Sequence, residues 1–223
     1  MIKKTALIAS VALALSSSVA VAEKMGVVGL YSGDFELDDQ AVTALGCAIQ
    51  REGAIVAAQG KLAYDLTQPD KFVVLDCEDG VLGQADRRQA ATSLFSDGSA
   101  IAIFEGALTN FPIDDQNGEV AKRQYVLKLG YYNNADVDAR EQDLAALNML
   151  AQPLDGHWIN ESFLQVHAAT GIPTPDEVVV IHYESAEVAD QFRAENADIL
   201  KEVSDFNDAH LTSFTYLVGS ASR

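Results

Sequence analysis

The chain has 223 residues, of which 48% are hydrophobic, and a formal net charge of −18. This apolar content is typical of a globular protein and excludes a mainly disordered chain. The strong negative charge repels phosphate backbones and anionic lipid headgroups, so it argues against binding to nucleic acid or to membrane surfaces.

The first 22 residues have the pattern of a secretory signal peptide. Lys3 and Lys4 precede a run of small and apolar residues, 5–22, that ends in an Ala-Val-Ala tripeptide. Its strongly apolar part is shorter than the roughly 20 residues that a membrane-spanning helix needs. We therefore predict cleavage after Ala22, no membrane insertion of the mature protein, and a periplasmic or secreted location. Loss of the two lysines leaves 13 basic residues against 33 acidic ones, a net charge of −20.

Strand-like apolar runs and helical spacing alternate through the first half of the mature chain. The predicted elements are a strand at 26–31, a helix at 37–53, strands at 55–66 and 72–77, a helix at 84–95 and a strand at 100–104. This order is βαββαβ. A polar stretch, 107–123, then has the composition of a linker.

Cys47 and Cys77 are the only cysteines of the chain. Two thiols in an exported protein predict one intramolecular disulfide. On the predicted helix 37–53, however, Cys47 lies opposite the centre of the apolar stripe that includes Leu45 and Ile49. Either this helix is buried on more than one side, or the disulfide or the fold prediction is wrong.

The second half of the chain repeats the order of the first. The predicted elements are strands at 125–132, 163–168, 177–183 and 211–218, with helices at 137–154 and 186–203. We therefore predict four segments: a signal peptide at 1–22, a first βαββαβ unit at 23–106, a linker at 107–123 and a second unit at 124–223. An internal duplication explains why corresponding strands recur after about 100 residues.

The predicted fold class is α+β. A βαββαβ unit is the ferredoxin-like split βαβ, whose antiparallel sheet has both helices on one face and leaves the other face bare. Two tandem units can cover these bare faces by facing each other. The stretch 177–193, an apolar strand followed by a Ser-capped amphipathic helix, resembles the strand-then-helix segment of the dimeric α/β-barrel superfamily, which includes antibiotic-biosynthesis-type monooxygenases. This resemblance implies a pseudo-dimeric α/β barrel with a cavity between its two sheets.

The candidate ligand-binding residues lie in the second half, which contains all four histidines. They are His167, His182, Lys128, Gln165 and Trp158. If Leu164 faces the helices, Gln165 and His167 face the cavity, while the direction of His182 is undecided because both faces of its strand are apolar. Such a set can bind a small anion or supply an imidazole to haem iron, although a strand histidine is more often structural.

No catalytic motif is present: the sequence lacks G-x-S-x-G, H-E-x-x-H, a P-loop and C-x-x-C. We predict no metal site, because the acidic pairs lack the oxygen-ligand spacing of a calcium loop. The leading hypothesis is an exported small-molecule-binding or accessory protein without a cofactor. The alternatives are a cofactor-independent monooxygenase or haem-dependent enzyme on the same scaffold, and an acidic protein that binds a basic partner.

Overall fold

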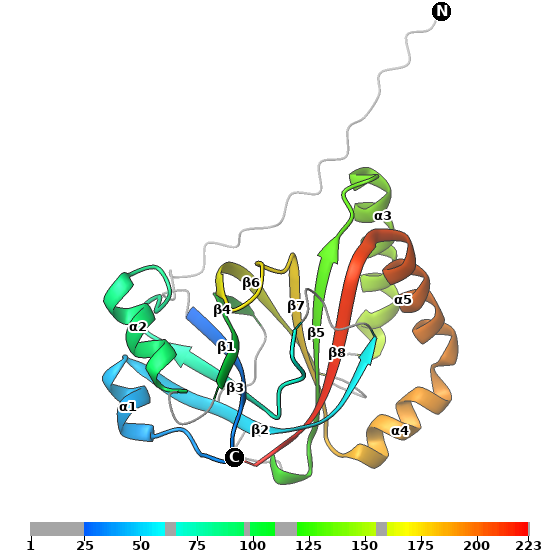
Figure 1. Cartoon of the computed structure of the whole chain (residues 1–223). Coiled ribbons are helices and arrows are strands. Elements are labelled where there is room, and N and C mark those ends of the chain that lie inside the picture. The colour runs from blue at the N-terminus through cyan, green and yellow to red at the C-terminus, as the bar shows by residue number, and fades with distance from the viewer. Residues whose placement is uncertain (1–24, 61–65, 96–98, 110–119, 155–159, 223) are drawn as a thin grey trace, which may run out of the picture.

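Within the described residues eight strands form in the predicted order, and five α-helices form where four were predicted. The computed structural model describes residues 25–60, 66–95, 99–109, 120–154 and 160–222 (Figure 1). The strands are β1 (Met25–Ser32), β2 (Cys47–Gly60), β3 (Lys71–Cys77), β4 (Ser99–Thr109), β5 (Gln124–Tyr132), β6 (Asn160–Thr170), β7 (Glu177–Tyr183) and β8 (Leu211–Ala221). The helices are α1 (Asp39–Ala44), α2 (Ala85–Ser93), α3 (Val137–Ala151), α4 (Ala186–Glu195) and α5 (Ala197–His210), with short 3₁₀ turns η2 (Val120–Lys122) and η3 (Gln152–Leu154). None of the helices in these ranges is long and apolar enough to span a membrane.

The strands close into one antiparallel barrel in the order β1-β3-β2-β8-β5-β7-β6-β4. Strands β2-β3-β1-β4 and β8-β5-β7-β6 are each the four-stranded sheet of a ferredoxin-like unit. The two sheets join edge to edge through the pairs β2–β8 and β4–β6. The two halves therefore pair within one chain, which confirms the predicted α+β fold of two tandem βαββαβ units forming a pseudo-dimeric barrel.

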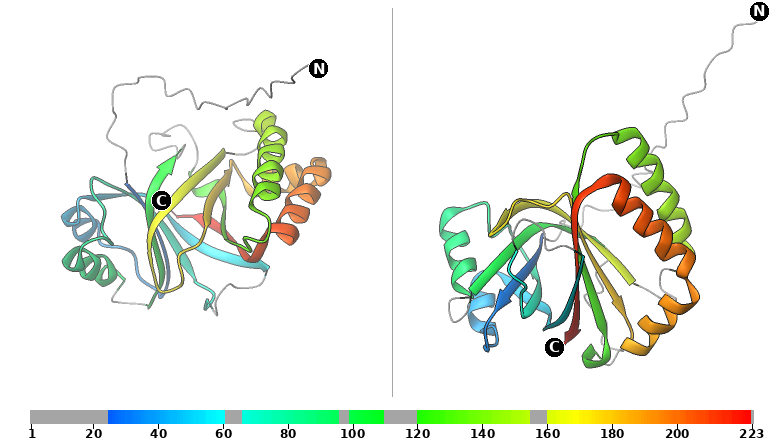
Figure 2. Two further views of the ribbon diagram at one scale, coloured as in Figure 1. Left: turned by 90° about the horizontal axis from the view of Figure 1, so that it is seen from above. Right: turned by 45° about the vertical axis from the view of Figure 1, so that its right-hand side comes forward.

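Three layers of apolar side chains hold the molecule together. The barrel interior is filled by a cluster from all eight strands that includes Phe72, Leu127 and Leu217. Helices α1 and α2 cover one outer side of the barrel and α3, α4 and α5 the opposite side (Figure 2). A second cluster packs under α1 and α2, and a third packs between β7 and α4. An eight-stranded barrel is just wide enough for side chains to fill, so an open cavity between the sheets is not needed for closure.

The prediction of a helix at 37–53 is wrong after residue 44. Helix α1 begins at the N-cap Asp38, whose carboxylate accepts a hydrogen bond of 2.8 Å from the Gln40 N–H. It ends before Gly46, which has a left-handed φ of 73° and is the kind of residue that terminates helices. The chain then enters β2 at Cys47. The apolar spacing that resembled a helix belongs to a strand that carries a β-bulge after Ile49.

The predicted helix at 186–203 is in fact two helices. α4 is capped by the Ser185 hydroxyl, which accepts from the Val188 N–H. Asn196 then leaves helical geometry, with φ −122° and ψ 37°, and α5 continues from Ala197 to His210. The break turns α5 so that Phe206 and His210 are buried against the barrel.

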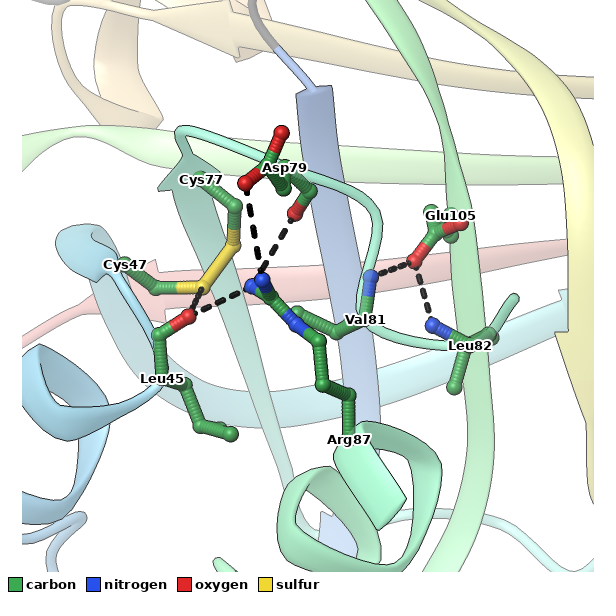
Figure 3. Close-up of a disulfide and its surroundings, with 8 residues drawn as sticks. All are labelled: Leu45, Cys47, Cys77, Asp79, Val81, Leu82, Arg87 and Glu105. Atoms are coloured by element: carbon green, nitrogen blue, oxygen red, sulfur yellow. Dashed lines mark hydrogen bonds and ion pairs between the residues drawn. A yellow bond between two sulfur atoms is a disulfide. The ribbon is translucent and has the colours of Figure 1, made fainter. Parts of the chain in front are cut away.

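The Cys47–Cys77 disulfide forms as predicted (Figure 3). The two residues are directly opposite each other in the β2–β3 register, with Cα atoms 4.0 Å apart. The helical-wheel conflict disappears because Cys47 lies on a strand. Arg87 of α2 reinforces this corner by donating to the Leu45 carbonyl at 2.6 Å and by pairing with the Asp79 carboxylate at 3.6 Å.

Glu105 lies close to the disulfide, on the outer face of β4 (Figure 3). Its buried carboxylate accepts hydrogen bonds from the backbone N–H groups of Val81 and of Leu82, the second at 2.6 Å. This carboxylate therefore fixes the loop that joins Cys77 to α2.

Candidate functional site

Polar side chains gather inside the barrel at one end, where β5 and β6 begin and β3 and β7 end. We call this region the polar end of the barrel; its described members are Arg51, Arg123, Tyr125, Ser162 and His182. Every one of them is buried, and they come from four different strands or strand starts. Most of the remaining interior is apolar.

Tyr125 and His182 form the centre of the polar end. They are directly opposite each other in the β5–β7 register, and strand alternation points Tyr125 into the barrel together with Leu127 and Leu129. The ring centroids of Tyr125 and His182 are 5.6 Å apart, and those of Tyr125 and Phe72 are 5.5 Å apart. The phenol and the imidazole are therefore held in a row of packed rings.

Arg51 reaches this row from β2, across the barrel. The β-bulge after Ile49 puts Arg51 opposite Val74, an interior residue of β3. Its Nε donates to the Tyr125 hydroxyl at 2.9 Å, and one terminal nitrogen donates to the Gln50 carbonyl. The side chain is 7% exposed. Hydrogen bonds to the Tyr125 hydroxyl and the Gln50 carbonyl thus help to position this guanidinium in the barrel interior.

Arg123 brings a second guanidinium to the same end. It directly follows η2 and is only 1% exposed, which makes it the largest fully buried side chain of the described residues. Its Nε lies 3.6 Å from the Glu184 carboxylate at the rim. Val120, in η2, packs against the interior cluster. The turn before β5 therefore both closes the rim and fixes Arg123.

Ser162 completes the polar end from β6. It lies opposite Val180 in the β6–β7 register, shares an interior face with Leu164, and is fully buried. Its hydroxyl has no hydrogen-bond partner among the described residues. Burial of such a group without a partner costs about 1–3 kcal/mol of folding free energy, so Ser162 is an unfavourable residue in an otherwise well-packed core.

The chemistry of the polar end suits a small anion. Arginine has five N–H donors in a planar fork that matches a carboxylate, and it stays charged at all physiological pH values. Phenol and serine hydroxyls add neutral donors, and the surrounding apolar walls strengthen each electrostatic contact. Because side chains fill most of the interior, an anion bound at the polar end must be small.

The expectation that Gln165 and His167 face the barrel interior is wrong. Leu164 is the interior residue of β6, so its neighbours Phe163 and Gln165, and with them His167, lie on the outer face and are exposed. Phe163 is 41% exposed. The physical reason is that the more apolar of the two alternating sets fills the interior, where water is excluded from every side.

Lys128 also lies outside the barrel, on the face of β5 that α5 covers. Its ammonium group pairs with the Glu177 carboxylate and lies 5.7 Å from the centre of the Phe206 ring. The same carboxylate accepts a hydrogen bond of 2.8 Å from the Tyr132 hydroxyl. Burial, and then the negative charge of Glu177, raise the pKa of Tyr132 well above its usual range. Lys128 therefore helps to attach α5 to the outer face of the sheet and does not contribute to the barrel interior.

The structure therefore brings only His182, of the five predicted site residues, to the polar end. Lys128, Gln165 and His167 are on the outer face, and Trp158 lies outside the described residues. Sequence reasoning missed Arg51, Arg123, Tyr125 and Ser162. The sequence does contain a signal for Arg123 and Tyr125, because they alternate with Leu127 along one face of the predicted strand. Arg51 had no such signal, because it lies in the segment that was predicted to be a helix.

The described histidines do not fit an axial ligand of haem, which needs an imidazole nitrogen facing an open pocket. His182 is packed in the filled interior, and His167 is exposed on β6. His210 has its Nε2 2.8 Å from an Asp143 carboxylate oxygen. Two shallow hollows that border α2 are lined by no histidine. Within the same residues no group of three or more His, Cys, Asp or Glu could hold a metal ion.

Comparison with solved structures supports the fold, whereas two comparisons of the sequence found no match. No protein-family model matches the chain, and no curated protein matches it in sequence. An anthrone oxidase-like protein of known structure has a TM-score of 0.54 and 10% identity, with 92% of this chain and 93% of that chain covered. Chlorite dismutase from Candidatus Nitrospira defluvii, in complex with imidazole, has a TM-score of 0.53 and 12% identity over 90% of this chain and 92% of that one.

These likenesses establish the class of fold. The chain has the fold of these proteins, two ferredoxin-like βαββαβ units joined in one closed antiparallel barrel, which is the fold that the resemblance of residues 177–193 implied. It shares this fold with an anthrone oxidase-like protein and with a chlorite dismutase. At 10–12% identity the likeness concerns the fold alone, so any activity must be argued from the residues of this chain.

Proposed function

We propose that this protein is an exported binding protein for a small carboxylate, which it holds at the polar end of the barrel. The observation that carries the proposal is the burial of two guanidinium groups, Arg51 and Arg123, inside one end of the barrel beside Tyr125 and His182. Burying two charges in one place is costly even where each has partners, so such an arrangement is uncommon in a core that serves only packing. Ionisable groups so placed are candidates for a functional site.

The test is calorimetric titration of the purified protein with butyrate, a small monocarboxylate. Arg51→Met is expected to weaken butyrate binding about tenfold or more, because a hydrogen bond to a charged group contributes about 1.5–3 kcal/mol. Arg51→Lys retains the charge and part of the affinity.

The matched control is Arg193→Met, which removes an exposed guanidinium from α4 and should leave binding unchanged. Circular dichroism of each variant separates lost binding from lost folding. If the folded wild-type protein binds neither butyrate nor its hydroxylated derivatives, the proposal is wrong and an acidic interaction protein becomes the better hypothesis.

Export is part of the same proposal. Residues 1–22 lie outside the described structure, so the support comes from the signal-peptide pattern and from the disulfide, which is typical of oxidising compartments. N-terminal sequencing of the protein recovered from the periplasm or medium of its host is expected to begin at Glu23. A protein that retains residues 1–22 would contradict this part of the proposal.

A second candidate function is cofactor-independent oxidation of a quinol-like molecule at the same place. The observation that favours it is the pairing of an imidazole, His182, with the Tyr125 phenol inside a scaffold shared with an anthrone oxidase-like protein. An imidazole can accept a proton from a bound phenol. Oxygen consumption with a quinol, lost in His182→Phe, would support this activity.

A further inference from the structure

The Ser162 hydroxyl is a buried polar group that the contacts within the barrel do not explain. It is fully buried, it faces the interior of β6, and it has no partner among the described residues. A serine hydroxyl is both a donor and an acceptor, so it needs a polar atom next to it. An alanine in the same place would pack without this penalty.

The position of Ser162 relates it to the arginines. Val180 is opposite Ser162, and His182 is the next interior residue of β7, so Ser162 is a diagonal neighbour of His182 on the same face. In the closed strand order β2 and β6 stand four places apart, on opposite sides of the barrel. Arg51 and Ser162 therefore approach the polar end from opposite sides.

We infer that the ligand of this barrel is a carboxylate that bears a second oxygen, a hydroxyl or a carbonyl, and that Ser162 is the residue that selects it. This inference rests on the proposed function. The carboxylate pairs with Arg51 on one side, and the second oxygen pairs with the Ser162 hydroxyl on the other. The Ser162 hydroxyl, which has no partner among the described residues, thereby gains a hydrogen bond.

The experiment compares butyrate with 2-, 3- and 4-hydroxybutyrate, which share one carbon chain and one charge. In the wild-type protein at least one hydroxy acid is expected to bind about three- to tenfold more tightly than butyrate, the effect of one added hydrogen bond. Ser162→Ala should abolish this preference, so that the affinities for the hydroxy acid and for butyrate become equal to within about twofold. The preferred isomer reports the spacing between Arg51 and Ser162.

A second readout needs no ligand. Without added ligand, Ser162→Ala should raise the Tm, because it removes a buried hydroxyl that no described residue pairs with. The control Thr212→Val removes a hydroxyl that does have a partner, the Tyr131 carbonyl at 3.1 Å, so it should lower the Tm and leave the preference intact.

The outcomes separate the two proposals. Failure of all four acids to bind overturns the proposed function and this inference together. Binding of butyrate without any preference for a hydroxy acid, or a preference that survives Ser162→Ala, overturns the inference alone. A lowered Tm for ligand-free Ser162→Ala also overturns it, because the hydroxyl is then satisfied inside the protein by a bound water molecule.

Discussion

Replacing Phe72 by alanine is expected to destabilise the protein by about 3–5 kcal/mol, the usual cost of removing a large aromatic side chain from a core. Phe72 is fully buried in the barrel interior and packs against the Tyr125 ring. Its ring also fills the space above Gly53 and Gly219, where an added Cβ would come within 2.7 Å of the ring edge. The neighbouring strands cannot close over the resulting cavity, because each is hydrogen-bonded within a closed barrel.

The free energy of unfolding from urea titration measures this effect. Phe163→Ala is the matched control, since the same change at an exposed site on the outer face of β6 should cost far less. Because Phe72 holds Tyr125, and Tyr125 holds Arg51, the variant should also bind butyrate more weakly. A loss of stability below about 1 kcal/mol for Phe72→Ala would mean that the interior is loosely packed.

The Cys47→Ala/Cys77→Ala double variant is expected to lose about 3 kcal/mol of stability. The disulfide joins residues 30 positions apart, and the chain-entropy model assigns a cross-link of this length about that stabilisation. The bond ties the start of β2 to the end of β3, the same strand pair that carries Arg51 and Phe72. Its loss should therefore lower the Tm by several degrees.

Reduction provides the control for this prediction. A reducing agent should lower the Tm of the wild-type protein to near that of the double variant and should leave the variant unchanged. If reduction has no effect on the wild-type protein although the thiols become titratable, the pairing of β2 with β3 holds this corner without the disulfide.

The candidate site was harder to predict than the fold for a reason visible at Arg51 and Lys128. Both are basic residues on strands with apolar neighbours, and a single strand does not reveal which of its faces meets the barrel interior. Lys128 lies outside because Leu127 and Leu129 occupy the interior. Arg51 lies inside because a β-bulge shifts the alternation of β2 by one residue. Such a bulge leaves no clear mark in one sequence.

The sequence by itself determined the repeated βαββαβ order of the strands and the disulfide partners. Alternating apolar runs specify strands and helices locally, and two cysteines allow only one intramolecular bond. Tertiary structure alone decided that Gly46 ends α1, that the halves join through β2–β8 and β4–β6, and that Ser162, not His167, faces the interior. These choices depend on which side chains fill the closed barrel, and that packing is a property of all eight strands together.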